Sequence, residues 1–245
     1  MKQFSQGFKT VLSSFKLAVQ PGIRLYVILP LLINTLLFAT VIVYGANSLS
    51  NLIDSLIAQW QWLEWLTWLL WPLFVIVALT IVFFCFSIIA NLIGAPFNGF
   101  LAEAVERKLT GKPIDDENNL PVTQILVTAI KSEFQKFLYF IIRAIPLLIL
   151  FIIPMANVVA PIIWFLFSAW MLTIEYADYP MGNHDIAFPE QRLKLSEHRQ
   201  LTFGFGVAVM ILTLIPVINF IAMPVAVIAA TQLYLQYLKT DISNK

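Results

Sequence analysis

Apolar residues in this chain fall into one short periodic stretch followed by four long runs. Within residues 1–20, large apolar side chains recur at helical spacing and lysines repeat every seven residues. The apolar positions are Phe4, Phe8, Val11, Leu12, Phe15 and Val19, and the lysines are Lys2, Lys9 and Lys16. This pattern predicts an amphipathic helix that lies on an anionic membrane surface and ends at Pro21–Gly22.

The first two long runs each fit one membrane crossing. Residues 25–46 are apolar and carry no charge, which suits a single span at about 20 residues per crossing. The next run is free of charge between Glu64 and Glu103, and a helix over about residues 68–91 is expected to cross back. We therefore predict two spanning helices within residues 25–98, followed by a cytoplasmic helical segment over residues 99–143.

The third and fourth runs share the pattern I-P-x-x-N-x-x-A, which starts at Ile153 and again 62 residues later at Ile215. Proline interrupts a helix and asparagine readily adopts turn geometry, so each run predicts a helix–turn–helix. The predicted arms are residues 144–153, 162–174, 201–215 and 225–238. Such arms reach only part of a roughly 30 Å hydrocarbon core, which favours re-entrant hairpins over residues 144–174 and 201–238. Paired kinked spans, or one long kinked crossing each, remain the alternatives.

Composition agrees with an all-α integral membrane protein built as one domain over residues 1–245. The chain is 60% hydrophobic and 12% charged, with a mean hydropathy of +0.83, whereas soluble domains carry about 25% charged residues. The net charge of +1 gives no support for a nucleic-acid partner. Two histidines without a ligand cluster, and the lack of nucleotide-binding or hydrolase motifs, predict no metal, no cofactor and no enzymatic activity.

Basic residues are distributed asymmetrically along the chain. None occurs from residue 25 to residue 106, and all 15 lie before or after that block. Two crossings and two re-entrant hairpins would place every basic residue on one face, which the positive-inside rule makes cytoplasmic.

The first candidate site is the sequence Pro21-Gly22-Ile23-Arg24. A break just before a helix leaves free N–H groups and the positive helix end, and an arginine adds a fork that suits a tetrahedral oxyanion. The alternative is that Arg24 only anchors the first span at the interface.

Further candidates for a pore or for coupling follow the second span and precede the third run. They are Asn91, Asn98, Glu103, Glu106, Arg107 and Arg143. Glu103 and Arg107 are spaced to pair on one helix face, and the two glutamates are the first carboxylates that could carry protons after the second span. Arg143 could pair with Glu175 or Asp178. The alternatives are a solvated helix start, an asparagine used in packing, and an arginine that snorkels to the headgroups.

Several sequence blocks resemble the CysZ sulfate permease family. They are Q-P-G-I-R from Gln20, A-N-L-I-G-A-P-F-N-G-F-L-A-E from Ala90, E-F-Q-K-F-L-Y-F from Glu133, W-F-L-F-S-A-W-M-L from Trp164, E-Y-A-D-Y-P from Glu175 and I-P-V-I-N-F-I-A-M-P-V-A-V from Ile215. The resemblance covers nearly the whole chain.

The resemblance implies a multi-pass protein of the bacterial inner membrane that imports sulfate for cysteine synthesis, as a permease or channel, and forms homo-oligomers. It also implies two spans with two half-membrane hairpins, and a sulfate site at the glycine–x–arginine motif, matched here by Gly22, Ile23 and Arg24. A second basic residue often follows that arginine, and Leu25 replaces it here. The rival hypotheses are a membrane-embedded lipid-modifying enzyme and a non-catalytic assembly protein.

Overall fold

A computed structural model describes residues 2–59, 68–69, 72–73, 75–76, 80, 97–112 and 122–239 of the chain. All regular secondary structure in these described residues is helical, as predicted. The chain divides into two compact units, one made of Met1–Val27 with Asn98–Lys245 and the other of Ile28–Phe97. Each unit is described by itself.

The long helix α2 (Arg24–Gln59) contains the first predicted span. Its residues Arg24–Gly45 have a mean hydropathy of 2.3 and suffice to cross a membrane. The helix continues for 13 residues beyond the predicted end at Ala46, because the polar residues there include neither proline nor glycine. Of the second predicted span, only isolated helical residues between 68 and 80 are described, and the rest lies outside the described residues.

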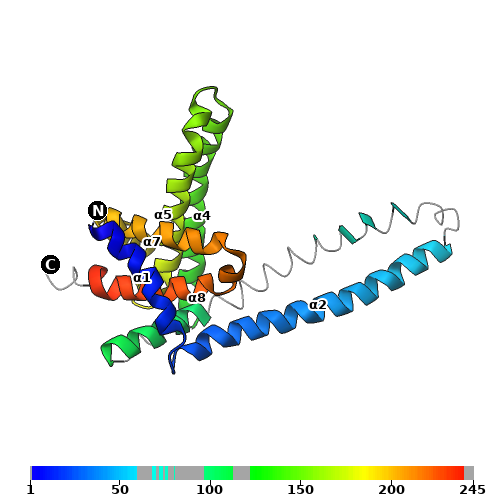
Figure 1. Cartoon of the computed structure of the whole chain (residues 1–245), viewed down its shortest axis with the longest axis horizontal. Coiled ribbons are helices and arrows are strands. Elements are labelled where there is room, and N and C mark those ends of the chain that lie inside the picture. Colours follow the sequence, from blue (N-terminus) through cyan, green and yellow to red (C-terminus); the bar gives the residue numbers. More distant parts are fainter. Residues whose placement is uncertain are drawn as a thin grey trace. The chain divides into compact units, whose positions relative to one another are not determined.

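Two helical hairpins make up most of the unit formed by Met1–Val27 and Asn98–Lys245 (Figure 1). In the first, α4 (Val122–Ile152) and α5 (Ala160–Gly182) are joined through the short 3₁₀ helix η2 (Ala156–Val158). In the second, α7 (Arg199–Leu214) and α8 (Pro216–Leu233) meet at Ile215, and the π-helix η3 (Tyr234–Leu238) continues α8. The helix–turn–helix predicted from each proline–asparagine repeat is therefore confirmed.

The two turns differ although their sequences repeat. Asn157 lies in η2, after Met155 at a φ of 70°, whereas Asn219 already belongs to the first turn of α8, where its N–H donates to Ile215 O. In both hairpins a proline near the first position of the returning helix, Pro161 or Pro216, needs no helix hydrogen bond there.

The predicted short arms are wrong for α4, α5 and α8. Residues 130–152, 160–182 and 216–238 each form 23 helical residues, which at about 1.5 Å per residue can cross a bilayer. Lys136 and Arg143 do not end α4, because carboxylates neutralise the lysine and the arginine lies over an aromatic ring. Only α7, with 16 residues, is as short as predicted.

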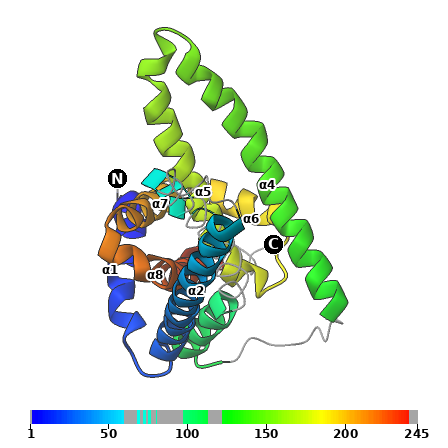
Figure 2. The same cartoon turned by 90° about the vertical axis from the view of Figure 1, so that its right-hand side faces the viewer.

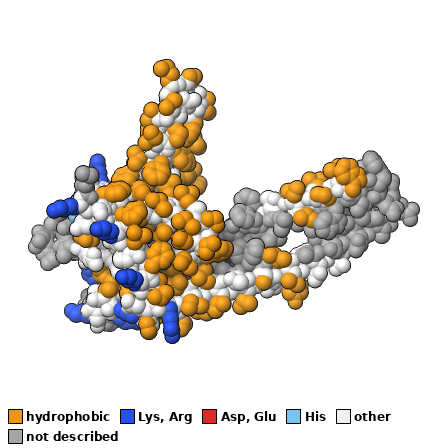
Figure 3. Space-filling model, viewed as in Figure 1, with side chains coloured by type: hydrophobic (Ala, Val, Ile, Leu, Met, Phe, Trp, Pro, Cys, Tyr) orange, Lys and Arg blue, Asp and Glu red, His pale blue; other side chains and the backbone are white. Residues whose placement is uncertain are grey.

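The hairpins run crosswise to each other. In Figure 1 the α4–α5 hairpin rises while α7 and α8 run across it, and in Figure 2, turned by 90°, α7 and α8 are seen nearly end-on. The short helix α6 (Phe188–Glu197) links the two hairpins. Hydrophobic side chains cover the visible face of the α4–α5 hairpin, and Lys and Arg gather away from its tip (Figure 3). This distribution suits a lipid-facing hairpin with a polar base.

The predicted N-terminal helix is α1 (Lys2–Ala18), which packs on α7 and α8. Its packed face consists mostly of small residues, namely Gly7, Val11, Ser14 and Ala18. The contact is close, since a Cβ on Gly7 would lie 2.0 Å from Leu201 O and a Cβ on Gly204 would lie 2.0 Å from Phe4 O. Much of the predicted apolar stripe points outward instead, with Leu12 and Val19 exposed by 50% and 72%.

Candidate functional site

The turn before α2 is held by its own backbone. Gln20 O accepts hydrogen bonds from the N–H groups of Ile23 and Arg24, at 3.1 and 3.0 Å. Gly22 has a φ of 89°, a conformation that other residues rarely adopt, and the Ile23 side chain is completely buried. The turn itself therefore uses the N–H groups of Ile23 and Arg24.

Arg24 and Lys108 supply the positive charge at this turn. The Arg24 side chain is exposed and makes no ion pair with a described residue. Lys108, in helical residues 97–110, donates from Nζ to Pro21 O at 2.8 Å. A cation from another helix therefore stands at the turn, although Leu25 leaves the following position apolar.

Glu106 lies at the centre of a buried ion cluster. Its Oε2 is 2.8 Å from His184 Nε2, which follows α5, and its Oε1 accepts from Lys239 Nζ at 2.7 Å, just beyond η3. Burial by itself raises the pKa of the Glu106 carboxyl, but the hydrogen bonds and charges of His184 and Lys239 outweigh it and hold that pKa below its usual value of 4.5. Glu106 is thus ionised at neutral pH and joins three chain segments.

The other candidates after the second predicted span have separate surroundings. Glu103 and Arg107 form the predicted i, i+4 pair, with 4.0 Å between Oε1 and Nη1, on a partly exposed helix face. Asn98 is buried, and its Nδ2 donates to Met223 Sδ at 3.3 Å. Asn91 lies outside the described residues.

Lys136, rather than Arg143, neutralises the carboxylates of the α4–α5 hairpin. Its Nζ lies 2.5 Å from Glu133 Oε1, 2.9 Å from Asp178 Oδ2 and 3.4 Å from Glu175 Oε2. The predicted pairing of Arg143 with Glu175 or Asp178 is wrong. The helices are antiparallel, so seven residues onward in α4 correspond to about seven residues backward in α5, too far from these acids.

Arg143 instead lies over the Tyr139 ring, with 3.6 Å from Cζ to the ring centroid. The Cζ of Arg192, from α6, lies 5.0 Å from the same centroid. The Tyr139 hydroxyl accepts a hydrogen bond from Trp170 Nε1 at 2.8 Å.

Sequence reasoning missed the partners Lys108, Lys136, His184 and Lys239. Lys108, His184 and Lys239 lie far along the chain from the residues that they contact, and Lys136 lies far from Glu175 and Asp178. The sequence signals are confined to Lys136, which has the i, i+3 spacing to Glu133 and is a charge inside an amphipathic segment, where an unpaired cation would be costly. Chemically, the exposed Arg24 and the nearby Lys108 offer positive charge and hydrogen-bond donors that suit an oxyanion. The ion clusters of Glu106 and Lys136 hold the surrounding helices together.

Known proteins are similar in sequence to most of this chain. The family described as Sulfate transporter CysZ/Etoposide-induced protein 2.4 matches residues 10–224. A protein of Vibrio parahaemolyticus named Sulfate transporter CysZ is 43% identical over 235 residues, covering 95% of each chain. Its namesake in Pectobacterium atrosepticum is 43% identical over 224 residues, covering 91% of this chain and 82% of its own.

These matches extend over most of the chain, and the related proteins are named as transporters, not enzymes. Four described helices are also long and apolar enough to cross a membrane. This multi-pass membrane protein belongs to the Sulfate transporter CysZ/Etoposide-induced protein 2.4 family.

Proposed function

We propose that this chain carries sulfate across the bacterial inner membrane, as a permease or channel that supplies cysteine biosynthesis. The observation that carries the proposal is the 43% identity to the Vibrio parahaemolyticus sulfate transporter over 95% of both chains. Identity at that level over the full length favours a shared substrate, since neither protein has a large region without a counterpart in the other.

Sulfate is proposed to bind at Gly22, Ile23 and Arg24. The exposed guanidinium of Arg24 offers paired donors to a tetrahedral dianion, and Lys108 stands at the same turn through its bond to Pro21 O. The buried Ile23 side chain and the Gln20 hydrogen bonds keep the turn rigid, which lowers the entropy cost of binding.

The hairpins are proposed to be re-entrant, with α1 at the interface and the chain forming homo-oligomers as one membrane domain. The crosswise directions of the hairpins support this topology, because at most one of them can stand along the bilayer normal (Figures 1 and 2). A hairpin tilted away from the normal penetrates less deeply than its length would allow.

The remaining candidates are proposed to line or couple the ion path. Sulfate entry against an inside-negative potential is opposed by roughly 4.6 kcal/mol at about 100 mV, so protons could enter with it. Glu103 is the proposed proton carrier, since Glu106 is held ionised by His184 and Lys239. Asn91, Asn98, Arg107 and Arg143 are proposed along the path.

Uptake of radiolabelled sulfate into liposomes containing the purified chain tests the function. We expect uptake well above that of protein-free liposomes, and a further rise when the external pH is lowered. Glu103→Gln should abolish the rise with pH while basal uptake persists. If correctly folded protein gives no uptake, the function is wrong, and if wild-type uptake ignores the pH gradient, only the coupling is wrong.

A further inference from the structure

A cavity of about 500 Å³ lies where the two hairpins meet α6. Its walls come from α4, α5, α6 and α7, and combine cations with aromatic rings. The residues that matter here are Tyr139, Trp170, Arg192, Ser196, Arg199 and Phe203. All belong to the same compact unit, and none belongs to the turn that carries Arg24.

The arginines of this cavity have guanidinium N–H donors that are not used in ion pairs with described residues. Among the described residues, neither Arg192 nor Arg199 forms an ion pair, whereas Lys136, Lys194 and Lys239 each do. Arg199 uses Nε to donate to Ser196 O at 3.2 Å, which leaves its two terminal nitrogens. The two guanidiniums thus present positive charge that no carboxylate of the described residues neutralises.

The Tyr139 hydroxyl adds a directed donor. It accepts from Trp170 Nε1 at 2.8 Å, so its own hydrogen remains for an acceptor in the cavity. Two guanidiniums and a phenol at the junction of four helices form a site for an oxygen-rich anion.

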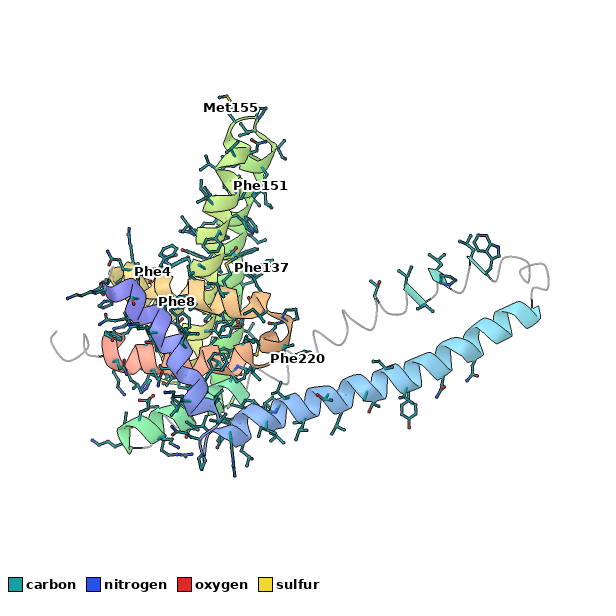
Figure 4. All side chains as sticks on the ribbon, in the orientation of Figure 1. Phe4, Phe8, Phe137, Phe151, Met155 and Phe220 are labelled. Carbon is teal, nitrogen blue, oxygen red and sulfur yellow. The ribbon has the colours of Figure 1, made fainter. Side chains whose placement is uncertain are left out.

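A shallow apolar groove of about 450 Å³ adjoins the cavity and shares Arg199 and Phe203 with it. Its other apolar walls come from α1, α5 and α7, namely Phe4, Phe165, Leu166 and Val207. Phe4 lies on α1 where that helix crosses α7 (Figure 4). Phe165 and Leu166 are exposed by 38% and 43%, so the groove offers apolar surface to a chain lying in it.

We infer that this cavity and groove bind one anionic phospholipid, with the phosphate between Arg192 and Arg199 and an acyl chain in the groove. A free oxyanion such as sulfate would use the cavity alone and leave the adjoining apolar surface uncovered. An amphiphile satisfies both parts, and basic pockets between membrane helices on the cytoplasmic side suit anionic headgroups. The inference is independent of the proposed sulfate site at Arg24.

The test is lipid binding to the purified, full-length chain in neutral detergent, followed by native mass spectrometry. Phosphatidylglycerol and phosphatidylcholine of equal chain length are titrated in parallel. The test variant is Arg192→Gln/Arg199→Gln, and the matched control Lys9→Gln/Lys131→Gln removes the same charge from exposed positions elsewhere. Arg192→Lys/Arg199→Lys keeps the charge but loses the guanidinium forks.

We expect one phosphatidylglycerol bound in preference to phosphatidylcholine, and about tenfold weaker binding in the glutamine variant only. The lysine variant should fall between the two, which tests the site even if the glutamine variant does not fold. Equal binding of both lipids, or equal weakening in the control, would overturn the inference. Displacement of the lipid by sulfate at the concentration that saturates transport would also overturn it, in favour of a second substrate site.

Discussion

At the scale of single residues, charged side chains differ in how completely the fold neutralises them. Glu106 and Lys136 are buried, and Lys136 contacts three carboxylates while Glu106 contacts Lys239 and the His184 ring. Arg24 is exposed and, among the described residues, has no ion-pair partner. Removing the first two charges should therefore affect stability, and removing the third should affect ligand binding.

Arg24→Ala should weaken sulfate binding by about tenfold without lowering the melting temperature, because it removes a charge-assisted donor and no packing contact. Arg24→Lys should restore part of the affinity. Leu25→Arg should strengthen binding, since Leu25 is 65% exposed and can accept a longer side chain. Titration calorimetry in detergent measures all three, and wild-type affinity in the alanine variant would leave Arg24 as an interfacial anchor.

Glu106→Gln should destabilise the protein by about 1–3 kcal/mol at neutral pH, since it removes a buried carboxylate that contacts Lys239 and His184. The folded-state pKa of Glu106 lies below the usual 4.5, so its contribution is complete above that value and is lost as the pH falls through the folded pKa. Melting curves between about pH 3 and pH 7 should show that the melting temperature of the variant falls less on acidification than that of the wild type, because only the wild type has this carboxylate to protonate. Parallel curves for the two proteins would contradict the ion cluster.

The candidate site could be predicted from the sequence only where its residues are close in the chain. The Glu103–Arg107 pair follows from helix periodicity and is present. Glu106 with Lys239, 133 residues apart, depends on how α8 and η3 return to helical residues 97–110, which no local pattern encodes. The pairing of Lys136 with Glu175 and Asp178, which the sequence suggested for Arg143, likewise depends on how α4 and α5 pack together.

At the scale of helices, the Pro–Gly and proline–asparagine motifs predicted the ends of helices better than the positions of charged residues did. Pro21–Gly22 and the two proline–asparagine repeats lie at real breaks, although proline alone does not end a helix here, since Pro30, Pro146, Pro180 and Pro224 all lie inside helices. Lys136 and Arg143 do not mark helix ends, because tertiary partners allow their charges inside α4. Helix lengths in this protein therefore depend on contacts that a single segment does not contain.

Gly204→Ala should displace α1 from α7, because the added Cβ would lie 2.0 Å from Phe4 O and backbone cannot yield cheaply. We expect a loss of about 1–3 kcal/mol in stability and faster proteolysis near the N-terminus. Gly182→Ala is the matched control, since nothing lies within 4 Å of a Cβ there. Equal stability of the two variants would show that the helices are not in close contact.

At the scale of the whole chain, the directions of the two hairpins bear on how deeply each enters the bilayer. Lys136, within α4, contacts Asp178 near the end of α5, so the chain returns to the side from which it entered whether the helices cross fully or partly. The crosswise α7–α8 hairpin cannot share its direction (Figures 1 and 2).

Single cysteines at Asn157 and at Glu190, both exposed, should distinguish the two topologies once Cys85 is replaced by alanine. In oriented vesicles Glu190→Cys should react with a membrane-impermeant reagent from the cytoplasmic side. For a re-entrant hairpin, Asn157→Cys should stay unreactive from the far side. Strong far-side labelling of Asn157→Cys would establish a full crossing pair.

The close contact between α1 and α7 also imposes an order on biosynthesis. Gly204 emerges from the ribosome 197 residues after Gly7, which takes on the order of 10–40 s at about 5–20 residues per second. During that interval α1 has no partner helix, but its apolar side chains and exposed lysines can hold it on the anionic face of the bilayer. The nascent N-terminus thus stays bound to the membrane surface until α7 and α8 have been synthesised and can pack against it.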